Sequence, residues 1–115
     1  MQNQDLLQVA QNYGCPLYIY DADKIVSQYN RLVKAFSKIE HFKIHYAVKA
    51  LSNINILKLL KKEGCGLDTV SIEEVLLGLH AGFDPSEIMY TPNGVSFEEI
   101  EKVAQMGVQI NIDNL

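Results

Sequence analysis

The sequence has few of the residues that bind metals or form disulfides. Its 115 residues include two cysteines and three histidines. Cys15 and Cys65 are far apart with no C-x-x-C spacing, and the histidines form no ligand pattern such as H-E-x-x-H. We therefore expect two reduced thiols, as in a cytosolic protein, and no metal site.

Positive charge and long apolar runs are also lacking. The net charge is −4 and the sequence pI is about 5.2, so the chain has no electrostatic footprint for nucleic acid. No stretch approaches the roughly 20 apolar residues that span a bilayer. Residues 1–10 have neither the basic start nor the apolar run of a secretory signal. We expect a cytoplasmic protein that binds neither nucleic acid nor membrane.

The apolar residues that are present alternate between two periods. Steps of three and four predict helices over 21–37, 54–64, 72–80 and 97–106, and shorter apolar runs predict strands over 43–48, 66–70, 88–91 and 108–112. Two helix starts carry an S-x-x-E capping box, formed by Ser71 with Glu74 and by Ser96 with Glu99. The strand starts lie roughly 22 residues apart, a βα repeat that predicts a parallel sheet with right-handed crossovers.

Two α/β architectures use such a repeat, an open doubly wound sheet and a (β/α)8 TIM barrel. A Rossmann fingerprint or a P-loop would favour the open sheet, and the sequence has neither. A complete barrel takes about 250 residues. If the chain is a barrel, we expect only its first half, and the sequence is interpreted as a fragment.

One lysine stands where chemistry is expected. Lys49 follows the apolar strand, and an unpaired ammonium is costly to bury. At the carboxyl end of a barrel strand it would face the mouth of the active site, where desolvation makes an amine a nucleophile toward an aldehyde. The pattern by itself is more often that of a surface lysine.

Five segments in order resemble motifs of the fold-type III, alanine-racemase-like pyridoxal-phosphate enzymes. Residues 46–50 are similar to the YAVKA segment that carries the cofactor lysine. Residues 13–21 resemble the YGTPLYVYD opening of the decarboxylases, with Cys15 in place of Thr. The remaining matches are GxDxxS at 66–71, AGxxPxxI at 81–88 and GVxINxDS at 107–114. Residues 91–96 with 110–114 are most similar to the diaminopimelate decarboxylases. Leu51 departs from the Asn usual after the motif and removes no reactive group.

The resemblance implies a site for pyridoxal 5′-phosphate. Lys49 would be the catalytic residue and hold the cofactor as a Schiff base. Asp68 would lie beside it, although capping a turn explains this residue equally well. His45 and Ala47 share the strand parity of Lys49, so we expect an interior histidine and a small residue that leaves room for the cofactor. Besides Lys49, the expected cofactor-binding residues are Asp68, Ser71, Glu74, Asn93 and Asp113, the last two as ends of the third and fourth strands. Capping alone already explains Ser71 and Glu74.

The resemblance also implies an activity. It is the decarboxylation of a small amino acid, meso-2,6-diaminopimelate, to L-lysine and carbon dioxide, the last step of bacterial lysine biosynthesis, in a homodimer with shared active sites. Residues 1–20 would pack with a C-terminal β domain, and residues 21–115 would form the first half of the cofactor-binding barrel. The groups that bind the phosphate and the pyridine nitrogen would lie outside this sequence, so we expect the isolated chain to be inactive and poorly stable.

Three alternatives remain open at this point. The first is a carboxynorspermidine, ornithine or arginine decarboxylase, or an alanine racemase, of the same fold. The second is a non-catalytic pyridoxal-phosphate carrier built on the same barrel. The third is a βα-repeat domain whose motif matches are accidental.

Overall fold

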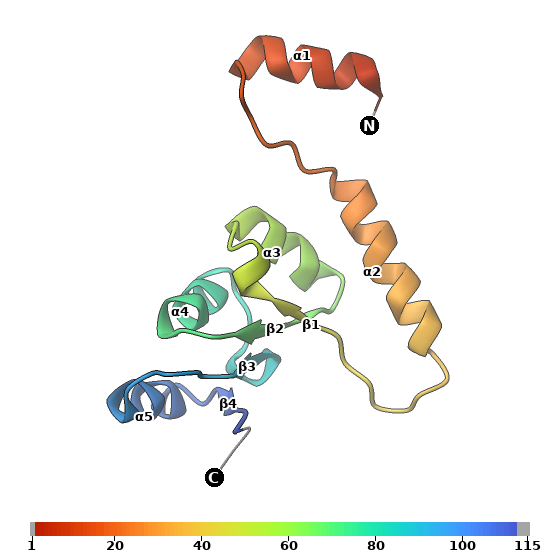
Figure 1. The fold of residues 1–115 in the computed structure, drawn as a ribbon. Helices are drawn as coiled ribbons and strands as arrows, with labels where there is room; N and C mark the ends of the chain where they lie inside the picture. Colours follow the sequence, from red (N-terminus) through yellow and green to blue (C-terminus); the bar gives the residue numbers. More distant parts are fainter. Residues whose placement is uncertain (1, 113–115) are drawn as a thin grey trace.

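The computed structural model describes residues 2–112. Two helices come first and are followed by alternating strands and helices, with α1 and α2 standing outside the body that the later elements form (Figure 1). The elements are α1 (Asn3–Tyr13), α2 (Ala22–Phe36), β1 (His45–Ala47), η1 (Val48–Ala50), α3 (Ile54–Lys62), β2 (Gly66–Thr69), α4 (Ile72–His80), η2 (Pro85–Glu87), β3 (Ile88–Tyr90), α5 (Phe97–Gln105) and β4 (Gln109–Ile110).

The four strands form one parallel sheet in the order β1-β2-β3-β4, as the βα repeat predicts. Ala47 pairs with Asp68, Asp68 with Met89 and Met89 with Gln109, so these residues form one row across the sheet. Side chains alternate along a strand, and the neighbouring rows therefore point to the opposite face. No described helix is long and apolar enough to cross a membrane.

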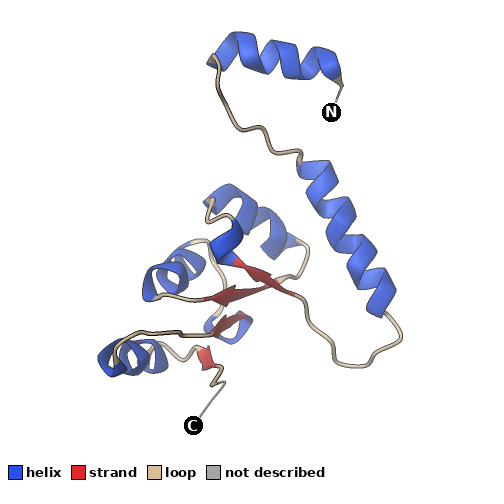
Figure 2. Ribbon diagram, in the orientation of Figure 1, coloured by secondary structure: helices blue, strands red, loops and turns tan. Residues whose placement is uncertain are grey.

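One face of the sheet carries the core. Helices α3, α4 and α5 follow one another along the same side of the strands (Figure 2). Their fully buried residues pack with those of the strands on this face; the helices contribute Leu57, Val75 and Val103, and the strands Leu67, Ile88 and Tyr90. The row of Ala47, Asp68 and Met89 on the other face is only half-buried, so within residues 2–112 that face is open.

The serine half of each predicted capping box is confirmed. Ser71 Oγ accepts the N–H of Glu74 at 3.3 Å, and Ser96 Oγ accepts the N–H of Glu99 at 3.2 Å. The glutamate half is wrong, because Glu74 accepts the N–H of Val70 rather than that of the cap residue. Glu99 accepts the N–H of Ile72 at 3.1 Å, at the start of the neighbouring helix α4. Parallel helices on one sheet face place their first turns side by side, so a carboxylate can cap its neighbour.

Two further expectations change with the observed bounds. The first strand ends at Ala47, so Lys49 lies in the 3-10 turn η1 and strand parity does not determine its direction. The third strand ends at Tyr90, so Asn93 lies in the bend beyond the strand and does not end it. The helix α1 was not predicted, and none of its residues is buried.

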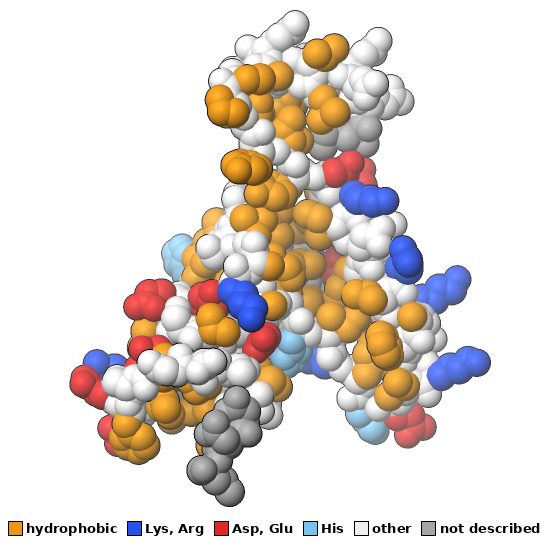
Figure 3. Space-filling model, viewed as in Figure 1, with side chains coloured by type: hydrophobic (Ala, Val, Ile, Leu, Met, Phe, Trp, Pro, Cys, Tyr) orange, Lys and Arg blue, Asp and Glu red, His pale blue; other side chains and the backbone are white. Residues whose placement is uncertain are grey.

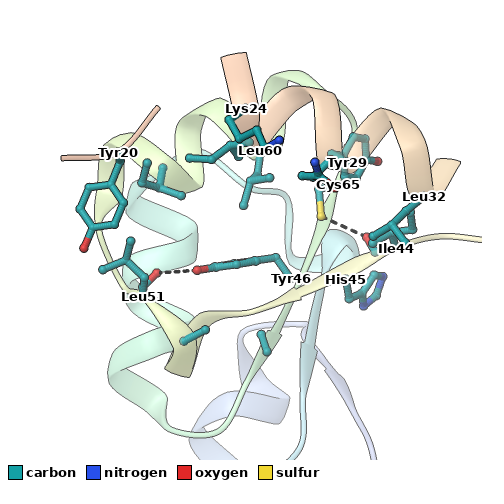
Figure 4. Close-up of a pocket in the computed structure, with 15 residues that line it drawn as sticks. Tyr20, Lys24, Tyr29, Leu32, Ile44, His45, Tyr46, Leu51, Leu60 and Cys65 are labelled. Atoms are coloured by element: carbon teal, nitrogen blue, oxygen red, sulfur yellow. Dashed lines mark hydrogen bonds between the residues drawn. The ribbon is translucent and has the colours of Figure 1, made fainter. Parts of the chain in front are cut away.

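An apolar groove of about 530 Å³ separates α2 from β1 and α3. Figure 4 shows the rings of Tyr29 and Tyr46 and the side chain of Leu60 around it. Cys65 also lines the groove, and its Sγ donates to the carbonyl of Ile44 at 3.3 Å. Burial raises the pKa of this thiol from 9.0 to about 11, whereas Cys15 is an exposed thiol.

Native Cys65 is therefore expected to resist alkylation. The thiolate is the reactive form, and a pKa raised by two units lowers its fraction about a hundredfold at pH 8. Iodoacetamide labelling, quantified by peptide mass spectrometry with and without denaturant, checks this in a Cys15→Ser protein. Equal native and denatured labelling rates for Cys65 would contradict the buried thiol.

Candidate functional site

The turn that carries Lys49 is held at both ends. Val48, at its start, is fully buried, and the N–H of Leu51 donates to the carbonyl of Val48 at 3.0 Å. Tyr46 donates its hydroxyl to the carbonyl of Leu51 at 3.2 Å, and Figure 4 shows the side chain of Tyr46 pointing toward Leu51. Lys49 itself is exposed and makes no hydrogen bond or ion pair with any described residue. A fixed backbone therefore presents a free amine just after the carboxyl end of β1.

Asp68 lies on the neighbouring strand, opposite Ala47. The turn η1 packs against this strand, so Lys49 and Asp68 belong to adjacent elements of the same sheet edge. Thr91 donates its hydroxyl to Asp68 Oδ1 at 2.8 Å, and both side chains are half-buried. The cap of α4 is Ser71, so Asp68 does not cap that helix.

Thr91 was not among the predicted site residues. It follows β3 directly, and its N–H continues the ladder by donating to the carbonyl of Thr69 at 2.8 Å. Because Met89 shares the row of Asp68, Thr91 falls on the same face one level closer to the carboxyl edge. Asn111 was also missed; it stands in the corresponding place after β4, and its N–H donates to the carbonyl of Tyr90 at 2.8 Å. The alternation of side chains along the strands could have identified both residues, but only with the register between the strands known.

Ser71 and Glu74 lie at the start of α4, where hydrogen bonds within the first turn occupy them. Glu74 Oε2 accepts the N–H of Val70 at 2.8 Å. The N–H of Ile72 is taken by Glu99, whose carboxylate also accepts the hydroxyl of the fully buried Tyr90 at 2.6 Å. Burial and the Glu99 carboxylate raise the pKa of Tyr90, so its hydroxyl stays protonated and donates.

The remaining predicted residues lie further out. Asn93 is exposed in the bend between β3 and α5 and makes no side-chain hydrogen bond within the described part of the chain. Asp113 lies outside the described residues. Among residues 2–112, no group of three or more His, Cys, Asp or Glu could hold a metal ion, and the expected absence of a metal site stays a prediction.

His45 lies at the amino end of β1, away from Lys49. It is half-buried and pairs with Gly66, and a Cβ on that glycine would lie 2.6 Å from His45 Cδ2. Burial lowers the pKa of His45, the charge of Lys43 lowers it further, and Asp68 opposes the shift. The imidazole packs over Gly66 of the neighbouring strand, on the face of Ala47 and Asp68, and its place in the interior of a closed barrel stays a prediction.

Lys49, Ala47 and Asp68 together fit the carbonyl end of a cofactor. Lys49 supplies an amine with no competing partner, and Ala47, on the open face beside it, has a small side chain. Asp68 supplies a carboxylate already oriented by Thr91. An amine, a small residue and a fixed acceptor on one open sheet edge can bind an aldehyde and orient the ring attached to it.

A family profile decides the assignment. The profile described as pyridoxal-dependent decarboxylase, pyridoxal binding domain, matches residues 22–115. The chain belongs to the pyridoxal-dependent decarboxylase family. The expected cofactor, pyridoxal phosphate, is confirmed by this domain. Accidental motif matches are thereby excluded.

Several diaminopimelate decarboxylases are similar to this chain. The chain is 41% identical over 111 residues to a diaminopimelate decarboxylase from Methanothermobacter thermautotrophicus, covering 96% of the chain and 26% of that protein. The crystal structure of diaminopimelate decarboxylase from M. jannaschii with L-lysine matches with a TM-score of 0.88 and 31% identity, over 95% of this chain and 26% of that one. The α/β class and the first half of a (β/α)8 barrel are confirmed by this match.

A structure with another substrate range is also similar. The lysine/ornithine decarboxylase from Vibrio vulnificus complexed with cadaverine has a TM-score of 0.86 at 26% identity, covering 97% of this chain and 30% of that one. The chain thus spans about a quarter of the length of the decarboxylases that it matches.

Proposed function

We propose that the protein decarboxylates meso-2,6-diaminopimelate to L-lysine and carbon dioxide with pyridoxal phosphate bound to Lys49. The observation that carries this proposal is the unpartnered amine of Lys49, held by a fixed turn in a pyridoxal binding domain. Identities of 30% to 41% to curated diaminopimelate decarboxylases support the substrate. A related structure contains L-lysine, the proposed product.

Each predicted site residue receives a proposed role. Lys49 binds the cofactor through its amine and is the catalytic residue. Asp68 accepts a hydrogen bond from the bound ligand with the oxygen that Thr91 leaves free. Ser71 and Glu74 contribute indirectly, because their hydrogen bonds fix the end of β2 and the start of α4. For Asn93 and Asp113 we propose contacts to ligand from the loops beyond β3 and β4.

The proposed mechanism divides the work between cofactor and chain. Pyridoxal phosphate, when bound, supplies the electron sink that stabilises the charge left by a departing carboxylate. Lys49 would hold this group through its Nζ, and the same amine would carry a proton during the reaction. Ala47 leaves space beside the lysine, and Asp68 with Thr91 provides an oriented acceptor. The open sheet edge admits a small amino acid.

The residues outside the barrel suggest further polypeptide around it. We propose that residues 1–20 pack against a C-terminal β domain and that residues 21–115 form the first half of the barrel. Exposed large apolar side chains are frequent over residues 6–39, and Figure 3 shows hydrophobic side chains at the surface of the molecule. They include Leu6, Leu7, Tyr13, Tyr18, Tyr20, Leu32, Phe36 and Ile39. Such a patch favours burial against other polypeptide.

We also propose a cytoplasmic homodimer with shared active sites. Two free thiols support a reducing compartment. Light scattering on the whole protein should give twice the subunit mass. Mixing two inactive variants, altered at Lys49 and at a site residue outside this chain, should restore activity if the sites are shared.

Substrate competition tests the proposed function. The whole protein is expected to release carbon dioxide from meso-diaminopimelate with a kcat/KM at least about a hundredfold above that for L-ornithine or L-lysine, because a site built for two polar ends rejects ligands lacking one. A preference for ornithine or lysine would select the alternative that the Vibrio vulnificus structure represents. No release from any amino acid, with cofactor still fixed to Lys49 by borohydride, would select the carrier.

A further inference from the structure

We infer that Thr91 is a positioning residue that orients the Asp68 carboxylate for ligand binding at the carboxyl edge of the sheet. The inference rests on the proposed function of the same site and adds a residue to it. It is carried by the 2.8 Å hydrogen bond from Thr91 Oγ1 to Asp68 Oδ1, between side chains 23 residues apart in sequence.

The backbone of Thr91 is fixed independently of its hydroxyl. Its N–H donates to the carbonyl of Thr69 at 2.8 Å, which extends the β2–β3 ladder by one residue. The next main-chain ladder bond runs from the N–H of Asn111 to the carbonyl of Tyr90, directly before Thr91. The main-chain bonds to both neighbouring strands therefore fix the position of Thr91 Cα. Only the side-chain conformation of Thr91 is left free to vary.

The Thr91 hydroxyl holds the Asp68 carboxylate in one of the several orientations that it could adopt. An aspartate on a half-open face can rotate about two bonds, and a hydrogen bond to its charged form is among the strong ones. Oδ1 is occupied by Thr91, whereas Oδ2 accepts no hydrogen bond within residues 2–112. Oδ2 is thus the acceptor left for a donor group of the cofactor or substrate. Without Thr91, the same carboxylate would have to be ordered at the moment of binding, which weakens binding.

The register explains why Thr91, and not a neighbour, has this role. Asp68 pairs with Met89, so a side chain two residues beyond Met89 stands diagonally above Asp68 on the same face. Thr69 belongs to the other face, where its hydroxyl donates to the carbonyl of Met89 at 2.9 Å. That bond supports the ladder and gives a matched comparison, because it involves the same residue type on the same pair of strands.

The test uses matched variants of the whole protein. Thr91→Val keeps the branched shape and removes the donor, whereas Thr91→Ser keeps the donor. The readout is the pyridoxal phosphate concentration that gives half-maximal fixation on Lys49 by borohydride, measured by peptide mass spectrometry. We expect Thr91→Val to raise this concentration about tenfold and Thr91→Ser to change it by less than about threefold.

Two further measurements separate positioning from support of the fold. Thr69→Val should lower the thermal midpoint and leave the half-maximal concentration within about threefold of native. In an Asp68→Ala protein, Thr91→Val should raise the half-maximal concentration by less than about a further threefold, because the carboxylate through which Thr91 acts is absent. Equal losses with Thr91→Val and Thr91→Ser, or an unchanged concentration with Thr91→Val, would overturn the inference. If the native protein shows no fixation on Lys49, the proposed function itself fails, a result distinct from these.

Discussion

Replacing Lys49 with alanine is expected to abolish covalent attachment of pyridoxal phosphate and to lower kcat by about a thousandfold or more. The amine has no partner among the described residues, so its removal leaves no unpaired group behind. Lys49→Arg should be equally inactive, because a guanidinium keeps the charge and is no nucleophile. Carbon dioxide release and borohydride fixation, measured on the same preparations, check the expectation.

A matched lysine controls for the loss of charge. Lys58 is exposed on α3 and makes no hydrogen bond or ion pair within residues 2–112. Lys58→Ala should therefore leave both turnover and fixation within about twofold of native. Turnover near the native value in Lys49→Ala would remove Lys49 from the chemistry, even if the fold and family stand.

Substituting Gly66 with alanine is expected to cause the largest loss of stability in the sheet. A Cβ at this position would lie 2.6 Å from His45 Cδ2 and 2.8 Å from the carbonyl oxygen of Glu87. The ring could turn away, but the carbonyl belongs to the backbone that leads into β3 and cannot move without disturbing the strand. Overpacking of this kind costs about 1–3 kcal/mol or more. The thermal midpoint of the whole protein should fall by several degrees.

Two comparisons isolate the steric cause. Gly94 has a φ of 68°, and a Cβ added there would meet nothing within 4 Å, so Gly94→Ala tests the left-handed backbone alone, at about 1 kcal/mol. Adding His45→Ala to Gly66→Ala should recover only part of the loss, because the contact with the Glu87 carbonyl persists. Full recovery would place the whole clash on the imidazole, and no loss at all would show that the strands can separate.

The fold could be predicted because local sequence patterns mark each strand and helix of the repeat. Apolar steps of three and four, with Gly64, Gly82 and Gly107 following three of the helices, marked the βα units that the structure contains. The turn η1 was missed since the apolar letters continue through Val48, although the backbone has already left the strand. The helix α1 was missed, although Leu6, Val9 and Tyr13 recur at helical steps of three and four.

Site residues that belong to a sequence motif could be predicted. Site residues whose position depends on the register of the strands could not. Lys49 stands out because a distinctive run of residues surrounds it. Thr91 is an ordinary strand-end threonine until the pairing of Asp68 with Met89 places it beside a carboxylate. Glu99 has the spacing of a local cap, but its partner is Ile72, 27 residues away on another helix. Sequence spacing cannot show which helix a carboxylate will cap.

Two carboxylates meet at the start of α4, that of Glu74 on α4 itself and that of Glu99 on the neighbouring α5. A helix start usually offers free N–H groups to an anion, but here Glu74 and Glu99 already occupy the N–H groups of Val70 and Ile72. A phosphate approaching this turn would meet two carboxylates and would be repelled. The carboxylates of Glu74 and Glu99 thus make this turn a poor site for an anion, and we expect the anionic end of a bound ligand to lie elsewhere.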